Sequence, residues 1–250
     1  MISLVGKRVL VTGGSRGIGR ATALLCAKAG ADVGVTYHTR RADAEAVAKS
    51  IRAMGRRAYV GGGDLGDAQC VSQLFAEVQA AFGGLDGFVA NHGIWPEAET
   101  QLASMAPERW RATMRTNLDA VFLTTRAALG LLAPGGRIVM VGSTAGQRGE
   151  ANHADYAATK GAVMSLVKSL AIECAPGITV NCVAPGWVDT EMCEGAFAGN
   201  GREEIAAGIP LHRVATADDV AGPILFLLSD LARHITGEVL NVNGGSVLCG

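Results

Sequence analysis

The sequence predicts an α/β fold: a doubly wound, mainly parallel sheet of seven strands with helices on both faces. Two observations lead to this prediction. Short runs of apolar and β-branched residues alternate with longer amphipathic stretches along the whole chain, which is the pattern of parallel strands joined by crossover helices. No repeat and no proline- or serine-rich linker interrupts the 250 residues. We therefore expect a single domain over residues 1–250.

The first half of the chain alternates regularly between the two kinds of element. The predicted strands are Arg8–Thr12, Asp32–Tyr37, Arg57–Gly61 and Asp86–Asn91. The predicted helices are Gly17–Ala29, Arg41–Met54 and a segment from Asp67 to Phe82. Gly30 and Gly55 follow the first two helices, where glycine readily ends a helix. Asp67 can accept hydrogen bonds from the first turn of the third helix.

The second half continues this alternation. The predicted strands are Arg137–Gly142, Ile178–Ala184 and Glu238–Val242, and the predicted helices are Asp155–Glu173 and Thr216–Ser229. Pro107 suits the first turn of a long helix after the linker His92–Ala106. Between Asp189 and Arg213 the pattern stops, and glycines gather among small and charged residues. We expect a substrate lid there, with a disordered insertion as the alternative.

Composition and charge exclude several classes of partner. The formal charge of −1 supplies no basic field for nucleic acid and no attraction to anionic membranes. No uncharged apolar run is long enough to cross a bilayer, and the N-terminus lacks the apolar core of a signal peptide, so we expect a cytoplasmic protein. The six cysteines lack metal-ligand spacing, and we expect reduced thiols and no metal site. They are Cys26, Cys70, Cys174, Cys182, Cys193 and Cys249.

A glycine-rich segment lies between the first predicted strand and the first predicted helix. It reads Thr12-Gly13-Gly14-Ser15-Arg16-Gly17-Ile18-Gly19. Glycines at this place permit a tight turn and a close approach of the backbone to a pyrophosphate, and the helix N-terminus presents free N–H groups to the anion. The position between strand and helix predicts a dinucleotide site of the Rossmann type.

A second motif places a phenol beside a cation. Tyr156 and Lys160 are four residues apart on one face of a predicted helix. A free phenol has a pKa of about 10, and a nearby cation favours the phenolate and brings the pKa toward the working range. Ser143 ends the fifth predicted strand, thirteen residues before Tyr156, and Asn91 ends the fourth. Ligands of an open α/β sheet bind beyond such strand ends, so we expect Ser143 and Asn91 at one site.

The spacing Gly-x-x-x-Gly-x-Gly of Gly13, Gly17 and Gly19 resembles that of the classical short-chain dehydrogenase/reductase family. The resemblance covers essentially the whole chain and is closest to the 3-oxoacyl-carrier-protein reductase group. His92 stands where the family usually has alanine, and we favour a structural role for it over a place in the active-site floor. The further cofactor contacts that the resemblance implies are Asp64 and Leu65 at the adenine, Asn91 and Gly93 after the fourth strand, and Pro185, Gly186, Val188 and Thr190 at the nicotinamide carboxamide.

The resemblance also implies a catalytic set and a reaction. The set is Asn117, Ser143, Tyr156 and Lys160. Ser143 is expected to hydrogen-bond the substrate carbonyl, and Tyr156 to protonate the alkoxide that forms as the nicotinamide delivers hydride. Lys160 is expected to bind the nicotinamide ribose and tune Tyr156, and Asn117 to hold a water that relays protons. The whole constellation predicts an NAD(P)-dependent oxidoreductase.

The end of the second strand decides the choice of cofactor. An NAD site normally places a carboxylate there, which binds the ribose hydroxyls and repels a 2′-phosphate. Here Tyr37 takes that place, and Arg16, Arg40 and Arg41 can pair with the phosphate, so we predict NADP(H) over NAD(H). The alternative is that Arg40 and Arg41 only flank the next helix. The complete predicted cofactor set is Gly13, Ser15, Arg16, Gly17, Ile18, Gly19, Tyr37, His38, Thr39, Arg40, Asp64, Leu65, Asn91, Gly93, Tyr156, Lys160, Pro185, Gly186, Val188 and Thr190.

The predicted function is hydride transfer between NADP(H) and a ketone or secondary alcohol, as a 3-oxoacyl reductase or a small-carbonyl reductase. The alternatives are a non-catalytic dinucleotide-sensing protein and an NAD-dependent alcohol dehydrogenase. Docking of carrier proteins in this group uses basic residues just before the fifth and sixth strands, where only Arg137 is basic, which favours a small free substrate. The family is usually tetrameric, and we expect a homotetramer or a dimer. The expected substrate-pocket residues are Trp95, Gln147, His153, Trp187, Met192 and Phe197.

Overall fold

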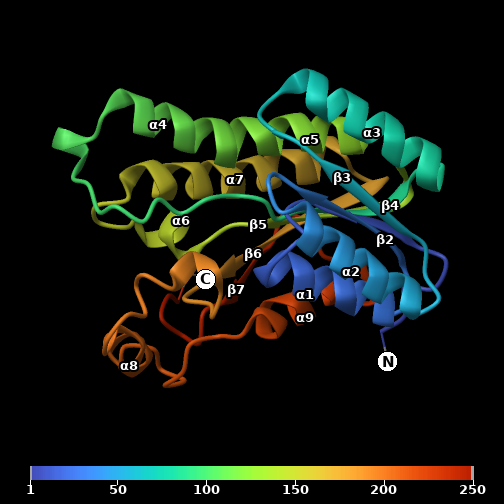
Figure 1. Ribbon diagram of the computed structural model, residues 1–250. Coiled ribbons are helices and arrows are strands. Elements are labelled where there is room, and N and C mark those ends of the chain that lie inside the picture. The colour runs from blue at the N-terminus through green and yellow to red at the C-terminus, as the bar shows by residue number, and fades with distance from the viewer. Residues whose placement is uncertain (1, 249–250) are drawn as a thin grey trace.

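The computed structural model describes residues 2–248 as a seven-stranded sheet with helices on both faces (Figure 1). The strand order is β3-β2-β1-β4-β5-β6-β7, and all neighbouring strands are parallel. This arrangement confirms the predicted doubly wound fold. The strands are β1 (Arg8–Val11), β2 (Asp32–Tyr37), β3 (Ala58–Gly62), β4 (Leu85–Ala90), β5 (Leu132–Val141), β6 (Ile178–Pro185) and β7 (Val239–Val242).

Two layers of helices enclose the sheet. One layer contains α1, α2 and α9, and the other contains α3, α4, α5 and α7 (Figure 1). The short helices α6 and α8 lie outside these layers. The bounds are α1 (Gly17–Lys28), α2 (Arg41–Ala53), α3 (Ala68–Phe82), α4 (Pro107–Met114), α5 (Ala120–Leu129), α6 (Thr144–Arg148), α7 (Ala154–Glu173), α8 (Gly201–Ala207) and α9 (Ala217–Leu228).

The strands bury side chains on both faces because successive residues point to opposite sides of a sheet. In β1, Val9 and Val11 belong to the core beneath α1, α2 and α9. Leu10 belongs to the opposite core, where Phe88 of β4 also packs. Buried apolar side chains on both faces hold the strand ends in a fixed position relative to the helices that follow them.

Two elements differ from their predicted form. β5 begins at Leu132 rather than Arg137, because Leu132 pairs with Leu85 of β4 before the ladder shifts register. The Pro134-Gly135-Gly136 run hid this extension, since proline and glycine disfavour strands. The long helix predicted after Pro107 is also not uniform. A π-helical turn, Arg115–Asp119, separates α4 from α5, and such turns often mark functional sites.

The segment expected as a lid is not a plain loop. It contains a 3₁₀ turn at Glu191–Cys193 and the helix α8, which projects from the body of the sheet (Figure 1). Within residues 2–248, no helix has the length and apolar character needed to cross a membrane. The cysteines of this range are free thiols, whereas Cys249 lies outside the described residues. The single-domain organisation over residues 1–250 stays a prediction.

Candidate active site

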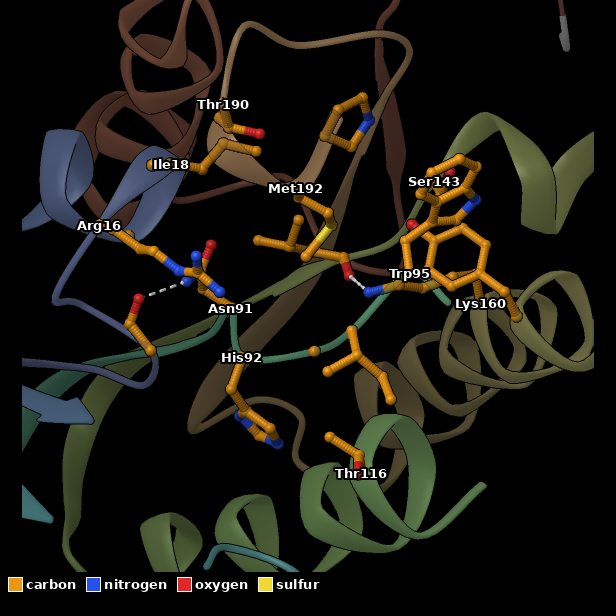
Figure 2. Close-up of a pocket in the computed structure, with 18 of the residues that line it drawn as sticks. Arg16, Ile18, Asn91, His92, Trp95, Thr116, Ser143, Lys160, Thr190 and Met192 are labelled. Carbon is orange, nitrogen blue, oxygen red and sulfur yellow. Dashed lines mark hydrogen bonds between the residues drawn. The ribbon is translucent and has the colours of Figure 1, made fainter. Parts of the chain in front are cut away.

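A cavity of about 540 Å³ lies beyond the carboxyl ends of the strands, around the point where the strand order reverses between β1 and β4. Its lining residues follow β1 to β6 in turn, which is the place where open α/β sheets bind ligands. Arg16 and Ile18 lie at one end, and Ser143 and Lys160 lie at the other (Figure 2). Every residue of the predicted cofactor set lines this cavity.

The glycine turn at the start of α1 has the shape of a diphosphate cradle. Gly13 and Gly17 adopt φ values of +64° and +52°, which favour glycine. A Cβ on Gly19 would lie 2.3 Å from the carbonyl oxygen of Gly13, so no larger residue fits. Asn91 ties the turn to β4, since its amide nitrogen lies 2.9 Å from the carbonyl oxygen of Thr12.

The N-terminus of α1 opens toward this cradle. No side chain caps its first turn, so its free N–H groups and the positive end of the helix dipole face the space that a diphosphate would fill. The residues present therefore fit a dinucleotide. Gly13, Gly17 and Gly19 would hold the diphosphate, together with the first turn of α1.

Ser143, Tyr156 and Lys160 meet at the opposite end of the cavity. Ser143 is the N-cap residue of α6, where its Oγ accepts a hydrogen bond of 3.1 Å from the backbone nitrogen of Ala145. Tyr156 lies on α7 and forms a side-chain hydrogen bond with Ser143. Lys160 lies one turn further along α7, with its ammonium 5.7 Å from the centroid of the Tyr156 ring.

The electrostatics of the pair differ from the expectation. Burial raises the pKa of the Tyr156 phenol well above its ordinary value, and the hydrogen bond with Ser143 lowers it only in part. Burial also lowers the pKa of Lys160 to about 8. The ammonium lies 2.8 Å from the carbonyl oxygen of Val141 (Figure 2). In the protein alone, desolvation therefore dominates the pKa of the phenol, and the neighbouring charges that add to the shift are those of Glu150 and Cys193 rather than that of Lys160.

Asn117 does not line the cavity. Its buried side chain lies in the π-helical turn, where Oδ1 accepts from the backbone nitrogen of Ile94 and Nδ2 donates to the carbonyl oxygen of Ile94, both at 2.8 Å. The Asn117 side chain therefore holds the chain that follows β4, and its predicted catalytic role stays a prediction. That chain passes close to Lys160, since a Cβ on Gly93 would lie 3.2 Å from Asn117 Oδ1 and 3.6 Å from Lys160 Nζ.

His92 is held as a neutral side chain. Its Nδ1 lies 2.8 Å from Thr12 Oγ1, and its ring points toward the helix that carries Thr116 (Figure 2). Burial lowers the pKa of His92 to about 3, with a further contribution from the Lys160 charge. This geometry favours the structural role of His92 over a place in the active-site floor, although His92 also borders the cavity.

The adenosine end of the cavity contains three ion pairs that the sequence did not reveal. The guanidinium groups of Arg16 and Arg40 both contact Glu191 Oε2 at 2.7 Å. Asp64 pairs with Arg115 at 2.6 Å. The hydrogen bond from the backbone N–H of Gly66 makes the largest contribution to holding the pKa of the Asp64 carboxyl below its usual range, and Arg115 lowers this pKa further. No local pattern relates these partners, because they are far apart in the chain. Arg41 is exposed and is not part of the cavity lining.

The expected substrate residues divide into two groups. Trp95, Trp187 and Met192 line the cavity, whereas Gln147, His153 and Phe197 do not. These last three support the wall instead. Gln147 bonds Asn241 at 2.6 Å, and the rings of His153 and Phe197 pack on Trp95 and Trp187 at centroid distances of 4.5 and 6.0 Å. Lining residues that sequence reasoning missed include Ile94, Arg148, Glu150, Glu191 and Cys193.

The groups that the cavity brings together indicate the class of protein. No group of His, Cys, Asp and Glu side chains within residues 2–248 is arranged to hold one. A diphosphate cradle, arginines near the adenosine end and a serine–tyrosine–lysine group instead share one cleft. On a doubly wound parallel sheet, this combination defines a nicotinamide-dinucleotide-dependent oxidoreductase.

Known proteins share this architecture along the whole chain. Residues 13–246 match the family profile described as enoyl-(acyl carrier protein) reductase. The chain is 40% identical over 252 residues to a 3-oxoacyl-[acyl-carrier-protein] reductase of Synechocystis sp., covering 99% of this chain and 100% of the relative. The protein belongs to the short-chain dehydrogenase/reductase family, as its motifs predicted.

Solved structures agree with this assignment. A short-chain dehydrogenase of Burkholderia cenocepacia in complex with NADP has a TM-score of 0.91 and 39% identity, covering 97% of this chain and 98% of its own. A Brucella melitensis protein, described as a short-chain dehydrogenase/reductase and a glucose/ribitol dehydrogenase, has a TM-score of 0.93 and 33% identity, covering 99% of both chains. The Synechocystis and Brucella relatives differ in their described substrates, so the family alone does not define the substrate here.

Proposed function

We propose that this protein transfers hydride between NADP(H) and a ketone or secondary alcohol. The observation that carries the proposal is the convergence of Ser143, Tyr156 and Lys160 on one cavity wall beside the dinucleotide cradle. The non-catalytic dinucleotide sensor is not favoured, because the acid, its hydrogen-bond partner and the lysine are all retained.

Each side chain has a defined task in this proposal. The bound nicotinamide supplies the hydride for reduction. Ser143 holds the substrate carbonyl oxygen and stabilises its developing charge. Tyr156 donates its phenolic proton to that oxygen, and its high pKa in the protein keeps the proton in place until then. Lys160 binds the nicotinamide ribose, and Asn117 positions the chain beside it.

Two guanidinium groups at the adenosine end support a preference for NADP(H) over NAD(H). Arg16 and Arg40 converge on one anionic oxygen, which is the geometry that a phosphate monoester would use. No acidic residue occurs from Tyr37 to Arg40, where an NAD site normally has one.

The surface before β5 and β6 supports a small free substrate rather than a carrier-bound one. Arg137, the basic residue predicted just before the fifth strand, lies within β5, and its side chain is 9% exposed and paired with Asp230 at 3.1 Å. It is therefore poorly placed to dock an acidic carrier protein. A 3-oxoacyl thioester remains the second candidate, because the Synechocystis relative is described as a reductase of that class.

The long helices support a homotetramer or dimer. Phe122 of α5 and Ile172 of α7 are 52% and 80% exposed in the single chain. These helices follow β4 and β5, the elements through which we expect copies of this chain to pack.

A panel of ketones tests the proposed function directly. We expect oxidation of NADPH with at least one free ketone or with a 3-oxoacyl thioester, and a fall in kcat of about 100-fold or more for Tyr156→Phe. The dissociation constant for NADP⁺ should be similar in both proteins. Intact NADP⁺ binding without hydride transfer to any carbonyl of the panel would instead identify a sensor.

A further inference from the structure

Glu191 links the expected lid to both arginines of the adenosine end. Its Oε2 lies 2.7 Å from Arg16 Nη1 and 2.7 Å from Arg40 Nη2. Arg16 lies in the glycine turn, Arg40 directly precedes α2, and Glu191 begins the 3₁₀ turn after β6. All three residues line the cavity. Within residues 2–248, Glu191 is the acid in ion-pair contact with Arg16, and Arg40 has one further acidic neighbour, Asp43, at 3.4 Å.

We propose that the Glu191 carboxylate is an internal ligand of the 2′-phosphate site. Binding of NADP(H) displaces this carboxylate from the two arginines, whereas binding of NAD(H) leaves it in place. This inference rests on the proposed assignment of Arg16 and Arg40 to that phosphate. A carboxylate held between two guanidinium groups occupies the position of a bound phosphate oxygen. Glu191 is therefore a specificity-determining residue, which lowers the affinity for NADP(H) and leaves that for NAD(H) unchanged.

The strength of the contact suits such an exchange. The side chains of Arg16, Arg40 and Glu191 are 48%, 45% and 41% exposed, and ion pairs at this exposure are weak. A phosphate monoester carries up to two negative charges and several acceptor oxygens, so it outcompetes a single carboxylate for both guanidinium groups. The carboxylate thus weakens NADP(H) binding without preventing it.

The exchange also reaches the substrate side of the cavity. Glu191 begins the 3₁₀ turn that contains Met192 and Cys193, and both of these residues line the cavity. The residue before it, Thr190, packs on the glycine turn, since a Cβ on Gly17 would lie 3.2 Å from Thr190 Cγ2. Release of Glu191 therefore frees a segment that joins the cofactor site to the substrate wall.

Calorimetry on the ligand-free protein tests this inference without turnover. The ligands are NADP⁺, NAD⁺, adenosine 2′,5′-bisphosphate and adenosine 5′-monophosphate. We expect Glu191→Gln to tighten NADP⁺ and the bisphosphate by about three- to tenfold, with NAD⁺ and the monophosphate changed less than about twofold. Glu194→Gln is the matched control, because it removes the same charge from the same segment without touching either arginine. It should leave all four constants near wild type.

Amide hydrogen exchange supplies a second readout. In wild type, the bisphosphate should increase exchange at residues 190–194 relative to the monophosphate, and in Glu191→Gln this difference should disappear. Unchanged or weaker NADP⁺ binding in Glu191→Gln, or equal tightening in Glu194→Gln, would overturn the inference. These results are independent of hydride transfer, so an inactive enzyme with the expected binding would contradict only the proposed function.

Discussion

The carboxylate of Asp155 and the guanidinium of Arg109 form an ion pair between α7 and α4, with Asp155 Oδ2 3.0 Å from Arg109 Nε. Asp155 is fully buried and also accepts a hydrogen bond of 2.8 Å from the Thr113 hydroxyl. Burial raises the pKa of Asp155, but the hydrogen bonds from Arg109 and Thr113 outweigh this effect and hold it below its usual range. Since Asp155 directly precedes Tyr156, the pair secures the first turn of the helix that carries the proposed acid.

Replacement of Asp155 by asparagine should therefore destabilise the protein. The change keeps the shape of the side chain but leaves the largely buried Arg109 without a counter-charge, at a cost of about 3 kcal/mol in the free energy of unfolding. Chemical denaturation monitored by circular dichroism measures this loss. Glu108→Gln removes an exposed partner of Arg111 and should stay within about 0.5 kcal/mol of wild type. Similar losses in the two variants would contradict a special role for the Asp155 pair.

Gly19→Ala should close the diphosphate cradle. The added methyl would lie 2.3 Å from the Gly13 carbonyl oxygen and 2.5 Å from Asn91 Nδ2, so the turn must shift. We expect cofactor affinity to fall more than about tenfold and stability to fall by about 1–3 kcal/mol.

Gly222→Ala offers a matched control for this change. Gly222 lies in α9, and a Cβ added to it would meet no atom within 4 Å beyond its chain neighbours and the backbone of its own helix. Alanine there should keep stability within about 0.5 kcal/mol of wild type, because the gain in helix propensity is opposed by contact with the ring of Pro223, which follows it. Cofactor binding should be unchanged. Titration calorimetry and thermal unfolding measure both quantities, and tight binding by Gly19→Ala would show that the cradle tolerates a side chain.

Cofactor binding should weaken at alkaline pH because of Lys160. Burial places its pKa at about 8 in the free protein, so above this pH the folded protein increasingly holds a neutral amine. We expect the ammonium form of Lys160 to donate to the ribose hydroxyls of the cofactor. At higher pH, the neutral amine of Lys160 must therefore take up a proton when the cofactor binds. The dissociation constant for NAD⁺ should rise between about pH 7 and pH 9.5, and calorimetry in buffers of different ionisation enthalpy should detect the proton.

Two variants isolate this effect. Lys160→Met should bind weakly and with little dependence on pH over the same range. Lys168 is exposed on the same helix, and Lys168→Met should keep the wild-type profile. A flat wild-type profile would mean that Lys160 stays charged when the cavity is empty.

The element pattern could be predicted because it depends on neighbours in the chain. Alternation of apolar runs and amphipathic stretches placed all seven strands, and the largest error in a strand boundary fell where Pro134 and Gly135 concealed the start of β5. The glycine turn and the Tyr156–Lys160 pair were found for the same reason, since each occupies one short segment. The π-helical turn at Asn117 was missed, because no residue type in Arg115–Asp119 distinguishes it from an α-helical turn.

The sequence by itself therefore determined the doubly wound fold, the dinucleotide cradle and the identity of the catalytic candidates. Only the tertiary structure decided how those residues are used. It turned Asn117 toward Ile94, placed Lys160 against Val141 and brought Glu191 to Arg16 and Arg40. The physical reason is distance along the chain: periodicity and capping act over a few residues, whereas these contacts and the burial that shifts each pKa arise only when separate elements pack together.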